Sequence, residues 1–246
     1  NKIDLDLQLA QNIQNLILPS DFPLNKSLEF ASYYSSAQKV GGDLYDVFNL
    51  RDDKIGIIIA DVSGKGIPAS IVMATCQTHL KHLVDKHSSP SETLIALNQL
   101  MLQTMKPGMF VTLIYGIIDL NKNQITISRA GHEAPIFFNK SSKEISPIIC
   151  EGMAVGIAPS EIFDTKIKDV TLNFQKGDIV VLFTDGLTEI RNNNIEFSNS
   201  GLMNLILKNH TYNAKKIISN IITDINDYSE NYNQQDDQTI LLVKHT

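Results

Sequence analysis

The sequence predicts an α+β fold: a sandwich of two antiparallel β-sheets flanked by α-helices. Segments with strand-like period two and segments with helical period occur in blocks rather than in alternation, which disfavours a doubly wound parallel sheet. Apolar residues make up 43% of the 246 residues and charged residues 20%, as in ordinary folded domains. Short β-rich segments are separated by Gly, Asn and Asp, which is typical of antiparallel connections.

The first predicted element is an amphipathic helix over residues 3–18, which Pro19 ends. Four apolar residues recur there at helical spacing: Leu5, Leu9, Ile13 and Leu16. A helix of this length is marginal alone, so the stripe must pack on the body of the protein, on the same helix of a second chain, or on both. We assign residues 1–25 to an N-terminal linker or switch helix and residues 26–246 to the main domain.

After residue 28 the hydrophobic period changes toward two, and helical segments return later. Residues 51–54 read as the turn of a hairpin, and the Ser91-Glu92 pair reads as a helix cap. The predicted strands are 30–34, 44–50, 55–60, 110–119, 124–130, 134–138, 145–149, 168–174, 178–183 and 239–244. The predicted later helices are 68–80, 91–102, 201–208 and 214–226.

Composition excludes several classes of protein. Acidic residues outnumber basic ones, 27 to 21, and no Lys/Arg cluster occurs, so we expect cations rather than nucleic acid as partners. Cys76 and Cys150 form no C-x-x-C pattern, which excludes a thiolate zinc site and predicts two core residues. No apolar stretch approaches the ~18 residues of a membrane span and no signal peptide is evident, so we expect a cytoplasmic fragment without direct membrane contact. Asn1 in place of Met suggests a domain of a longer protein.

The informative feature is a set of aspartates that lie at strand ends beside glycines. Each alone is ordinary turn chemistry. Asp43 and Asp61 are equally far from Asp52 at the predicted hairpin tip, so antiparallel pairing places them opposite each other at the open end. Opposed like charges are destabilising unless a cation neutralises them, and hard oxygen ligands select magnesium, manganese or calcium rather than zinc.

A second pair is predicted in the same way. Asp185 ends an apolar strand and Asp236 precedes the final strand. Both converge on the same edge as the first pair if these strands neighbour the hairpin.

Seven motifs, in this order, resemble those of the metal-dependent protein phosphatases of the protein phosphatase 2C type, specifically the bacterial SpoIIE-like or RsbU-like branch. They are Val40–Phe48, Ala60–Ser70, Met109–Thr112, Ala130–Pro135, Gly177–Asp178, Phe183–Glu189 and Asp236–Thr239. The resemblance covers roughly residues 26–246. It implies two stacked antiparallel sheets with a metal site at one end of the sandwich.

The resemblance implies a site for two divalent cations, manganese or magnesium. Asp61 would bridge the two metals, helped by the backbone carbonyl of Val62, and Asp43 would hold one of them. Asp185 and Asp236 would hold the other. Asp43 and Asp61 are thus the residues on which catalysis would depend.

Three residues are candidates for contacts with the substrate. Gly64 and Gly66 permit a tight strand-to-helix turn, and the helix N-terminus beyond it could attract an anion. A nucleotide-binding P-loop is excluded there, because Ile67 stands where Ser or Thr must hold magnesium. His132 either donates a proton or hydrogen bond near the substrate or stabilises its turn.

Asp237 points to the opposite side from Asp236 in an extended chain, which leaves Asp236 as the ligand.

The implied function is metal-dependent hydrolysis of phosphoserine or phosphothreonine on a protein. The resemblance implies as substrate a phosphorylated STAS-type anti-sigma-factor antagonist. The chain would be the cytosolic output domain of a bacterial signalling protein with an upstream sensor. A membrane-anchored sensor and a homodimer through the N-terminal helix are both compatible with this reading. The alternative is a catalytically silent domain of the same fold that binds such a partner.

Overall fold

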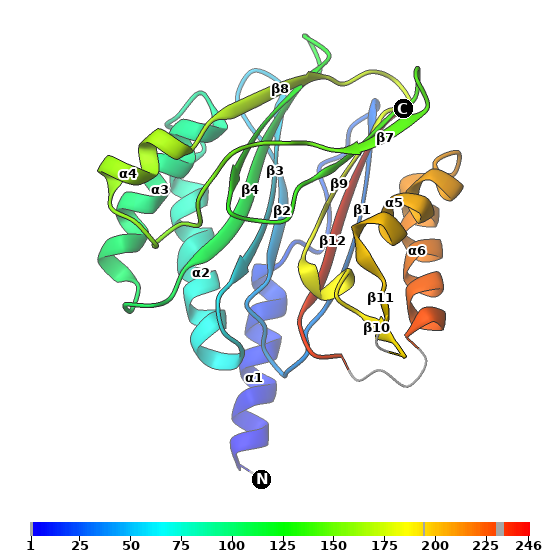
Figure 1. Cartoon of the computed structure of the whole chain (residues 1–246). Helices are drawn as coiled ribbons and strands as arrows, with labels where there is room; N and C mark the ends of the chain where they lie inside the picture. Colours follow the sequence, from blue (N-terminus) through cyan, green and yellow to red (C-terminus); the bar gives the residue numbers. More distant parts are fainter. Residues whose placement is uncertain (1, 194, 230–233) are drawn as a thin grey trace. The chain divides into compact units, whose positions relative to one another are not determined.

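The structure is a computed structural model that describes residues 2–193, 195–229 and 234–246. It contains two five-stranded antiparallel sheets, each with its own helices, in two compact units. Unit 1 comprises residues 1–23, 38–132 and 150–173, and unit 2 comprises residues 24–37, 133–149 and 174–246. The predicted α+β class with two antiparallel sheets is confirmed (Figure 1). Among the described residues no helix is both long and apolar enough to span a membrane.

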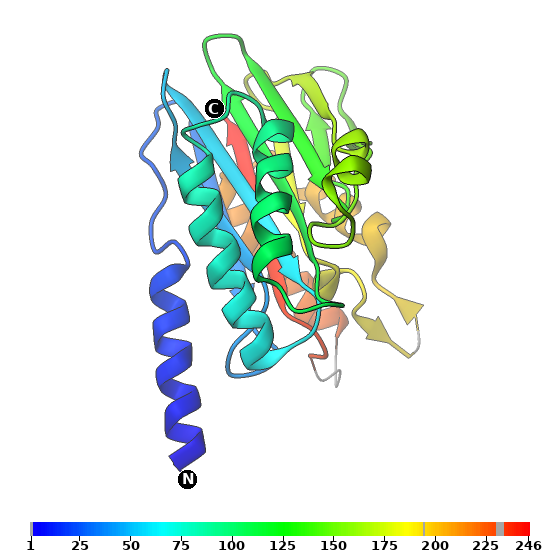
Figure 2. The ribbon, with the colours of Figure 1, turned by 90° about the vertical axis from the view of Figure 1, so that its left-hand side faces the viewer.

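Unit 1 is built on the sheet β2-β3-β4-β5-β8. Its strands are β2 (Leu44–Asn49), β3 (Lys54–Val62), β4 (Val111–Asp119), β5 (Gln124–Ala130) and β8 (Asp169–Asn173). Its helices are α1 (Lys2–Ile17), α2 (Gly66–Leu83), α3 (Pro90–Thr104) and α4 (Ser160–Lys166). Helices α2 and α3 lie side by side and pack against the central strands β3, β4 and β5 (Figure 2).

Helix α2 follows its predicted pattern, with Met73, Cys76 and Leu80 fully buried at helical spacing. Cys150 is also buried, so the prediction that both cysteines are core residues is confirmed. Helix α3 begins earlier than predicted. Ser89 is the N-cap and accepts a hydrogen bond from the Glu92 N–H at 3.3 Å, while Pro90 occupies the first turn, where its missing N–H costs nothing.

Unit 2 is built on the sheet β1-β12-β9-β6-β7. Its strands are β1 (Leu28–Ser35), β6 (Ile136–Asn139), β7 (Glu144–Pro147), β9 (Ile179–Phe183) and β12 (Gln238–His245), and a separate short pair is formed by β10 (Arg191–Asn192) and β11 (Ile195–Glu196). Its helices are the 3₁₀ turn η1 (Asp185–Leu187), α5 (Ser198–Asn209) and α6 (Ala214–Tyr228). In the core, alternate residues of β9 pack against the apolar face of α6. The buried residues therefore follow a period of two along β9 and a helical period along α6.

Helix α1 matches the predicted span, but its apolar stripe is exposed. The exposed fractions are 61% for Leu5, 52% for Leu9, 61% for Ile13 and 86% for Leu16. Figure 2 shows α1 beside the end of α2, with its N-terminal turns projecting beyond it. The stripe therefore does not pack on the body of the same chain, which was one of the partners predicted for it.

Candidate metal and active site

The β2–β3 hairpin has the register that the sequence predicts. Asp52 and Asp53 form its tip with φ of 58° and 55°, a conformation that Asp adopts more readily than most residues. Leu44 pairs with Ala60, so Asp43 and Asp61 fall opposite each other one step further along. Asp43 is only 1% exposed. A buried carboxylate opposite another carboxylate fits a site built for a cation.

The backbone around this pair is tightly packed. A Cβ at Gly42 would lie 3.0 Å from the carbonyl oxygen of Val62 and 3.2 Å from the Cβ of Ala69, so glycine allows the two segments to approach. Beyond Val62, the Ser63 N–H donates to the Phe110 carbonyl at 2.9 Å, and the Phe110 N–H donates to the Ser63 hydroxyl at 2.9 Å. The Val62 carbonyl is therefore held in place beside Asp61.

The predicted tight turn after β3 is present. Gly64 and Gly66 have φ of 95° and 69°, in the left-handed region that favours glycine. Lys65 is the N-cap of α2, and its side chain makes no capping hydrogen bond. The first N–H groups of α2 are therefore not capped by the side chain that precedes them.

His132 lies beside β4, the strand that pairs with the strand carrying Asp61. It is 4% exposed, and its ring Nδ1 is 2.9 Å from the hydroxyl of Thr112. Thr112 in turn pairs with Asp61 across β3 and β4, and its hydroxyl donates to the Asp61 carbonyl oxygen at 3.3 Å. Arg129 donates to the His132 carbonyl at 2.6 Å. The His132 ring therefore contacts β4, the strand that pairs with β3, and its carbonyl is held by Arg129; a role toward the substrate stays a prediction.

In unit 2, Asp185 follows the end of β9 and Asp236 lies just before β12, which pairs with β9. Gly186 is required here, because any Cβ would collide with the carbonyl oxygen of Asp237. Burial raises the pKa of the Asp185 carboxyl, and the nearby carboxylates of Glu189, Asp236 and Glu133 raise it further. A carboxyl that is half-buried among like charges fits a cation site.

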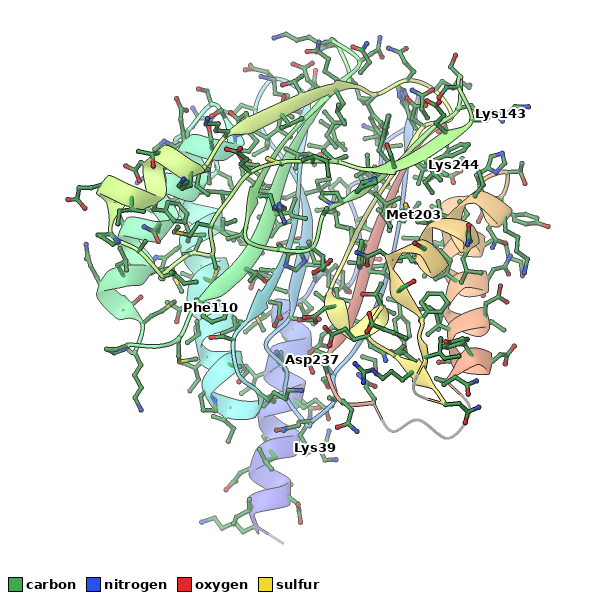
Figure 3. The ribbon with its side chains drawn as sticks, in the orientation of Figure 1. Lys39, Phe110, Lys143, Met203, Asp237 and Lys244 are labelled. Atoms are coloured by element: carbon green, nitrogen blue, oxygen red, sulfur yellow. The ribbon has the colours of Figure 1, made fainter. Side chains whose placement is uncertain are left out.

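Asp236 and Asp237 have different surroundings. Asp237 is buried, and its carboxylate accepts a hydrogen bond from the Ala37 N–H at 2.8 Å, which ties β12 to the end of β1 (Figure 3). The Asp236 carboxylate is partly exposed and acts electrostatically on Asp185. The Asp237 carboxylate therefore bonds a distant segment, whereas the Asp236 carboxylate accepts a hydrogen bond from its neighbour, the Asp237 N–H, at 2.9 Å and lies near enough to Asp185 to raise its pKa.

The two aspartate pairs are predicted from the sequence to converge on one sheet edge if their strands are neighbours, and this condition is not met. Strands β9 and β12 neighbour each other, but they do not neighbour the β2–β3 hairpin, which belongs to the other sheet. Within the described residues, no three or more His, Cys, Asp or Glu side chains gather closely enough to hold a metal. The candidate ligands occur as one pair of carboxylates in each unit, supplemented in unit 1 by the Val62 carbonyl. Their hard oxygen atoms are the donors that magnesium and manganese prefer.

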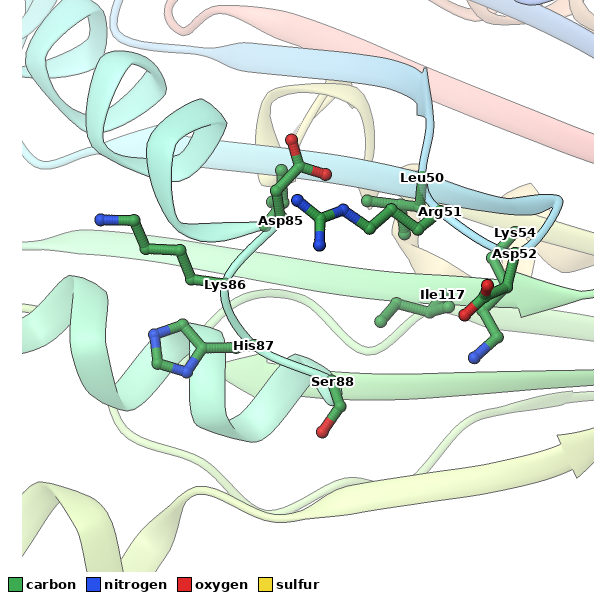
Figure 4. Close-up of a pocket in the computed structure, with 10 residues that line it drawn as sticks. Leu50, Arg51, Asp52, Lys54, Asp85, Lys86, His87, Ser88 and Ile117 are labelled. Atoms are coloured by element: carbon green, nitrogen blue, oxygen red, sulfur yellow. The ribbon is translucent and has the colours of Figure 1, made fainter.

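A pocket of about 230 Å³ lies at the tip of the same hairpin, away from the carboxylates. Charges of both signs line it, including Arg51, Lys86 and Asp85 (Figure 4). None of the predicted ligands is among its lining residues. The pocket therefore takes no part in the candidate metal site.

Sequence analysis missed three contributors to the site. Thr112 and Glu133 lie inside motifs that carry the family resemblance, but only the strand register and the fold place them beside Asp61 and Asp185. Gln14, on α1, hydrogen-bonds both backbone groups of Gly41. No sequence pattern distinguishes this glutamine from the other polar residues of its helix.

Comparison with known proteins identifies the family. The family model of stage II sporulation protein E (SpoIIE) matches residues 51–246. Phosphoserine phosphatase RsbU of Bacillus subtilis is 30% identical over 243 residues, which cover 99% of this chain and 71% of RsbU. The next two curated relatives are longer, and the chain spans 41% and 57% of their lengths.

Solved structures share the fold. The SiaA-PP2C domain of Pseudomonas aeruginosa matches with a TM-score of 0.87 at 19% identity, covering 100% of this chain and 97% of that domain. RsbX, crystallised with magnesium, matches with a TM-score of 0.66 at 18% identity, covering 92% of this chain and 99% of RsbX. With the family-model match and the similarity to RsbU, these findings show that the chain belongs to the SpoIIE family and is a serine/threonine phosphatase of the protein phosphatase 2C type.

Proposed function

We propose that the chain hydrolyses phosphoserine or phosphothreonine in a protein substrate and uses two divalent cations, manganese or magnesium. The observation that carries the proposal is the opposition of Asp43 and Asp61 at the open end of the hairpin, with Asp43 almost completely buried. Such a pair is costly to fold unless a cation binds it. The similarity to RsbU and the magnesium in RsbX support the same chemistry.

We assign Asp43, Asp61 and the Val62 carbonyl in unit 1, and Asp185 and Asp236 in unit 2, as the metal ligands. In unit 1 the support is the hairpin register and the close approach of the Val62 carbonyl to Gly42. In unit 2 the support is the raised pKa of Asp185, which its burial and the neighbouring carboxylates produce.

Bound cations would supply an activated water and offset charge on the phosphoryl oxygens. The chain's own residues would hold the cations: the carboxylate oxygens and the Val62 carbonyl oxygen are the proposed ligand atoms. Gly64, Gly66 and His132 are our candidates for contacts with the substrate. Cys76 and Cys150 are buried, so neither is placed to act as a covalent nucleophile.

We further propose that the substrate is a phosphorylated STAS-type anti-sigma-factor antagonist, and that an upstream sensor domain controls the phosphatase in the longer protein. RsbU, a named phosphoserine phosphatase, is the relative that supports this setting. The similarity to RsbU supports a signalling role. The choice of substrate is tested by measuring phosphate release from phosphorylated STAS-type antagonists and from unrelated phosphoproteins.

We also propose that α1 forms a homodimer contact. Its stripe of four residues, Leu5, Leu9, Ile13 and Leu16, is 52–86% exposed, and such a stripe on one helix matches the seam of a two-helix contact. Ile67 and Ile71 of α2, in the same unit, are 50% and 61% exposed. A groove of about 400 Å³ between α1 and α2 is lined by Leu7 and Ile67 but also by Lys39 and Lys65, so it is not a continuation of the stripe.

A metal titration tests the activity. Purified protein is stripped with a chelator, and phosphate release from an aryl phosphate and from a phosphoserine protein is followed as manganese or magnesium is added. We expect activity only with metal, and none in Asp61→Asn, which keeps the fold. Asp53→Asn, at the exposed tip of the same hairpin, is the matched control and should behave as wild type.

Two results would contradict the proposal. Wild-type activity that survives thorough chelation would exclude the metal mechanism. Binding of the phosphoprotein without any release of phosphate, at every metal concentration, would favour the silent partner-binding domain instead.

A further inference from the structure

We propose that His132 and Thr112 are positioning residues for Asp61: they fix the peptide that joins Asp61 to Val62 and thereby orient two metal ligands at once. This inference rests on the proposed function, because it takes Asp61 and Val62 to be ligands. It assigns a role to Thr112 and a specific protonation pattern to His132.

The first step is the register of β3 and β4. Asp61 pairs with Thr112, and Val62 pairs with Val111. Thr112 therefore lies directly across from Asp61, where its short side chain reaches the backbone of the opposite strand. Its hydroxyl is 3.3 Å from the Asp61 carbonyl oxygen and 2.9 Å from the Nδ1 atom of His132.

The second step follows from counting protons. A threonine hydroxyl has one hydrogen, so it can donate to the Asp61 carbonyl or to His132, but not to both. Both contacts are satisfied together when the Nδ1 atom of His132 carries a hydrogen and donates to Thr112, and Thr112 donates to Asp61. The geometry therefore selects the Nδ1–H form of the ring.

The third step is the rigidity of His132 itself. Its ring is 4% exposed, and its carbonyl accepts a hydrogen bond of 2.6 Å from Arg129, whose Nε also donates to the Cys150 carbonyl at 2.7 Å. The preceding Gly131 has φ of 70° and bridges to Leu113 on β4. The imidazole is thus anchored to the same sheet that carries Asp61.

The consequence concerns the orientation of the ligands. The Asp61 carbonyl belongs to the peptide plane between the Asp61 side chain and the Val62 carbonyl. A hydrogen bond to that carbonyl resists rotation of the plane and so restrains the two Cα atoms from which both ligand groups extend, while the Ser63–Phe110 bond fixes the following peptide. Residues that orient metal ligands in this way typically change metal affinity about 10- to 100-fold when they are removed.

The test uses the whole chain and measures manganese binding directly by calorimetry, with no substrate present. Thr112→Val removes the hydroxyl but keeps the shape, whereas Thr112→Ser keeps the hydroxyl. His132→Asn keeps a nitrogen near the Nδ1 position, whereas His132→Gln places it near Nε2. We expect about 10- to 100-fold weaker binding for Thr112→Val and His132→Gln, and restored binding for Thr112→Ser and His132→Asn.

Two further measurements separate positioning from stability. Unfolding of the metal-free variants reports any general loss of structure, which would also weaken metal binding. The ¹⁵N spectrum of the His132 ring in alkaline buffer reports which nitrogen carries the hydrogen. An Nε2–H ring would overturn the proposal, as would manganese affinities for Thr112→Val and His132→Gln equal to those of wild type.

Failure of the inference differs from failure of the proposed function. If wild type binds no manganese, or if Asp61→Asn binds it as tightly as wild type, the metal assignment itself is wrong. If wild type binds, Asp61→Asn does not, and the Thr112 and His132 variants bind normally, only the positioning role is excluded.

Discussion

Replacing Gln14 with methionine should detach helix α1 from the segment that leads to Asp43. Gln14 is the buried residue of α1, at 4% exposure, and its side-chain amide makes a reciprocal pair with Gly41. Its nitrogen donates to the Gly41 carbonyl at 2.7 Å, and its oxygen accepts from the Gly41 N–H at 3.0 Å. Methionine has a similar length but neither donates nor accepts comparably.

The expected magnitude follows from these two bonds. The substitution leaves one buried N–H and one buried C=O without a partner, at about 1–3 kcal/mol each, or about 2–6 kcal/mol together. For a chain of this size that corresponds to a loss of about 4–24 °C in melting temperature. If α1 separates instead, water satisfies Gly41, the global loss is smaller, and the amides of α1 lose their protection from hydrogen exchange.

Thermal unfolding and hydrogen exchange together measure both outcomes. Gln14→Glu, which can accept from the Gly41 N–H but cannot donate to its carbonyl, should be intermediate. Gln8→Met, at an exposed position of the same helix, is the control. Because Gly41 lies two residues before Asp43, the manganese concentration for half-maximal activity should also rise in Gln14→Met. If Gln14→Met and Gln8→Met unfold and exchange alike, the contact does not anchor α1.

Asp236→Asn should reduce metal-dependent turnover far more than Asp237→Asn, because the Asp236 carboxylate acts on the Asp185 carboxyl whereas the Asp237 carboxylate holds the Ala37 N–H beyond β1. Equal or reversed losses in steady-state assays would show that the ligand is misassigned. Replacing both Leu9 and Ile13 with glutamate should change the sedimentation behaviour and the manganese concentration for half-maximal activity. A variant that matches wild type in both would show that α1 only covers the domain and forms no dimer contact. Burial raises the pKa of the Cys76 thiol to about 12, so its labelling rate in native protein should not increase as the pH passes the ordinary value of 9.0, whereas in urea it should.

The fold was largely predictable because its core elements have clear periods. The apolar residues of α6 recur at helical spacing, and β9 is an uninterrupted apolar run whose alternate residues enter the core, so the sequence predicts both elements. The elements that sequence analysis missed are too short to show a period: α4 spans Ser160–Lys166, and β10 and β11 have two residues each. The start of α3 was placed late, because Ser89, the actual cap, precedes Pro90 and the Ser91-Glu92 pair that gave the signal.

The candidate site was predictable where local register alone decides it. The distance of Asp43 and Asp61 from the hairpin tip fixes their opposition before any fold is known. The environment of Asp185 depends instead on Glu133, about 50 residues earlier in the sequence, and on the pairing of β9 with β12. Such contacts are set by topology, which short-range patterns do not encode.

The two carboxylates of the hairpin have independent supports on either side. Gln14 holds Gly41 before Asp43, and Thr112 holds the carbonyl of Asp61 across β4. The first support belongs to α1, whose apolar stripe is exposed, so the proposed partner of α1 would reach the segment before Asp43 through the Gln14–Gly41 pair. The second belongs to the sheet itself and does not move with α1. Under the proposed control through α1, the signal would therefore change the position of Asp43 relative to Asp61, and we expect it to change metal affinity rather than the chemical step that follows.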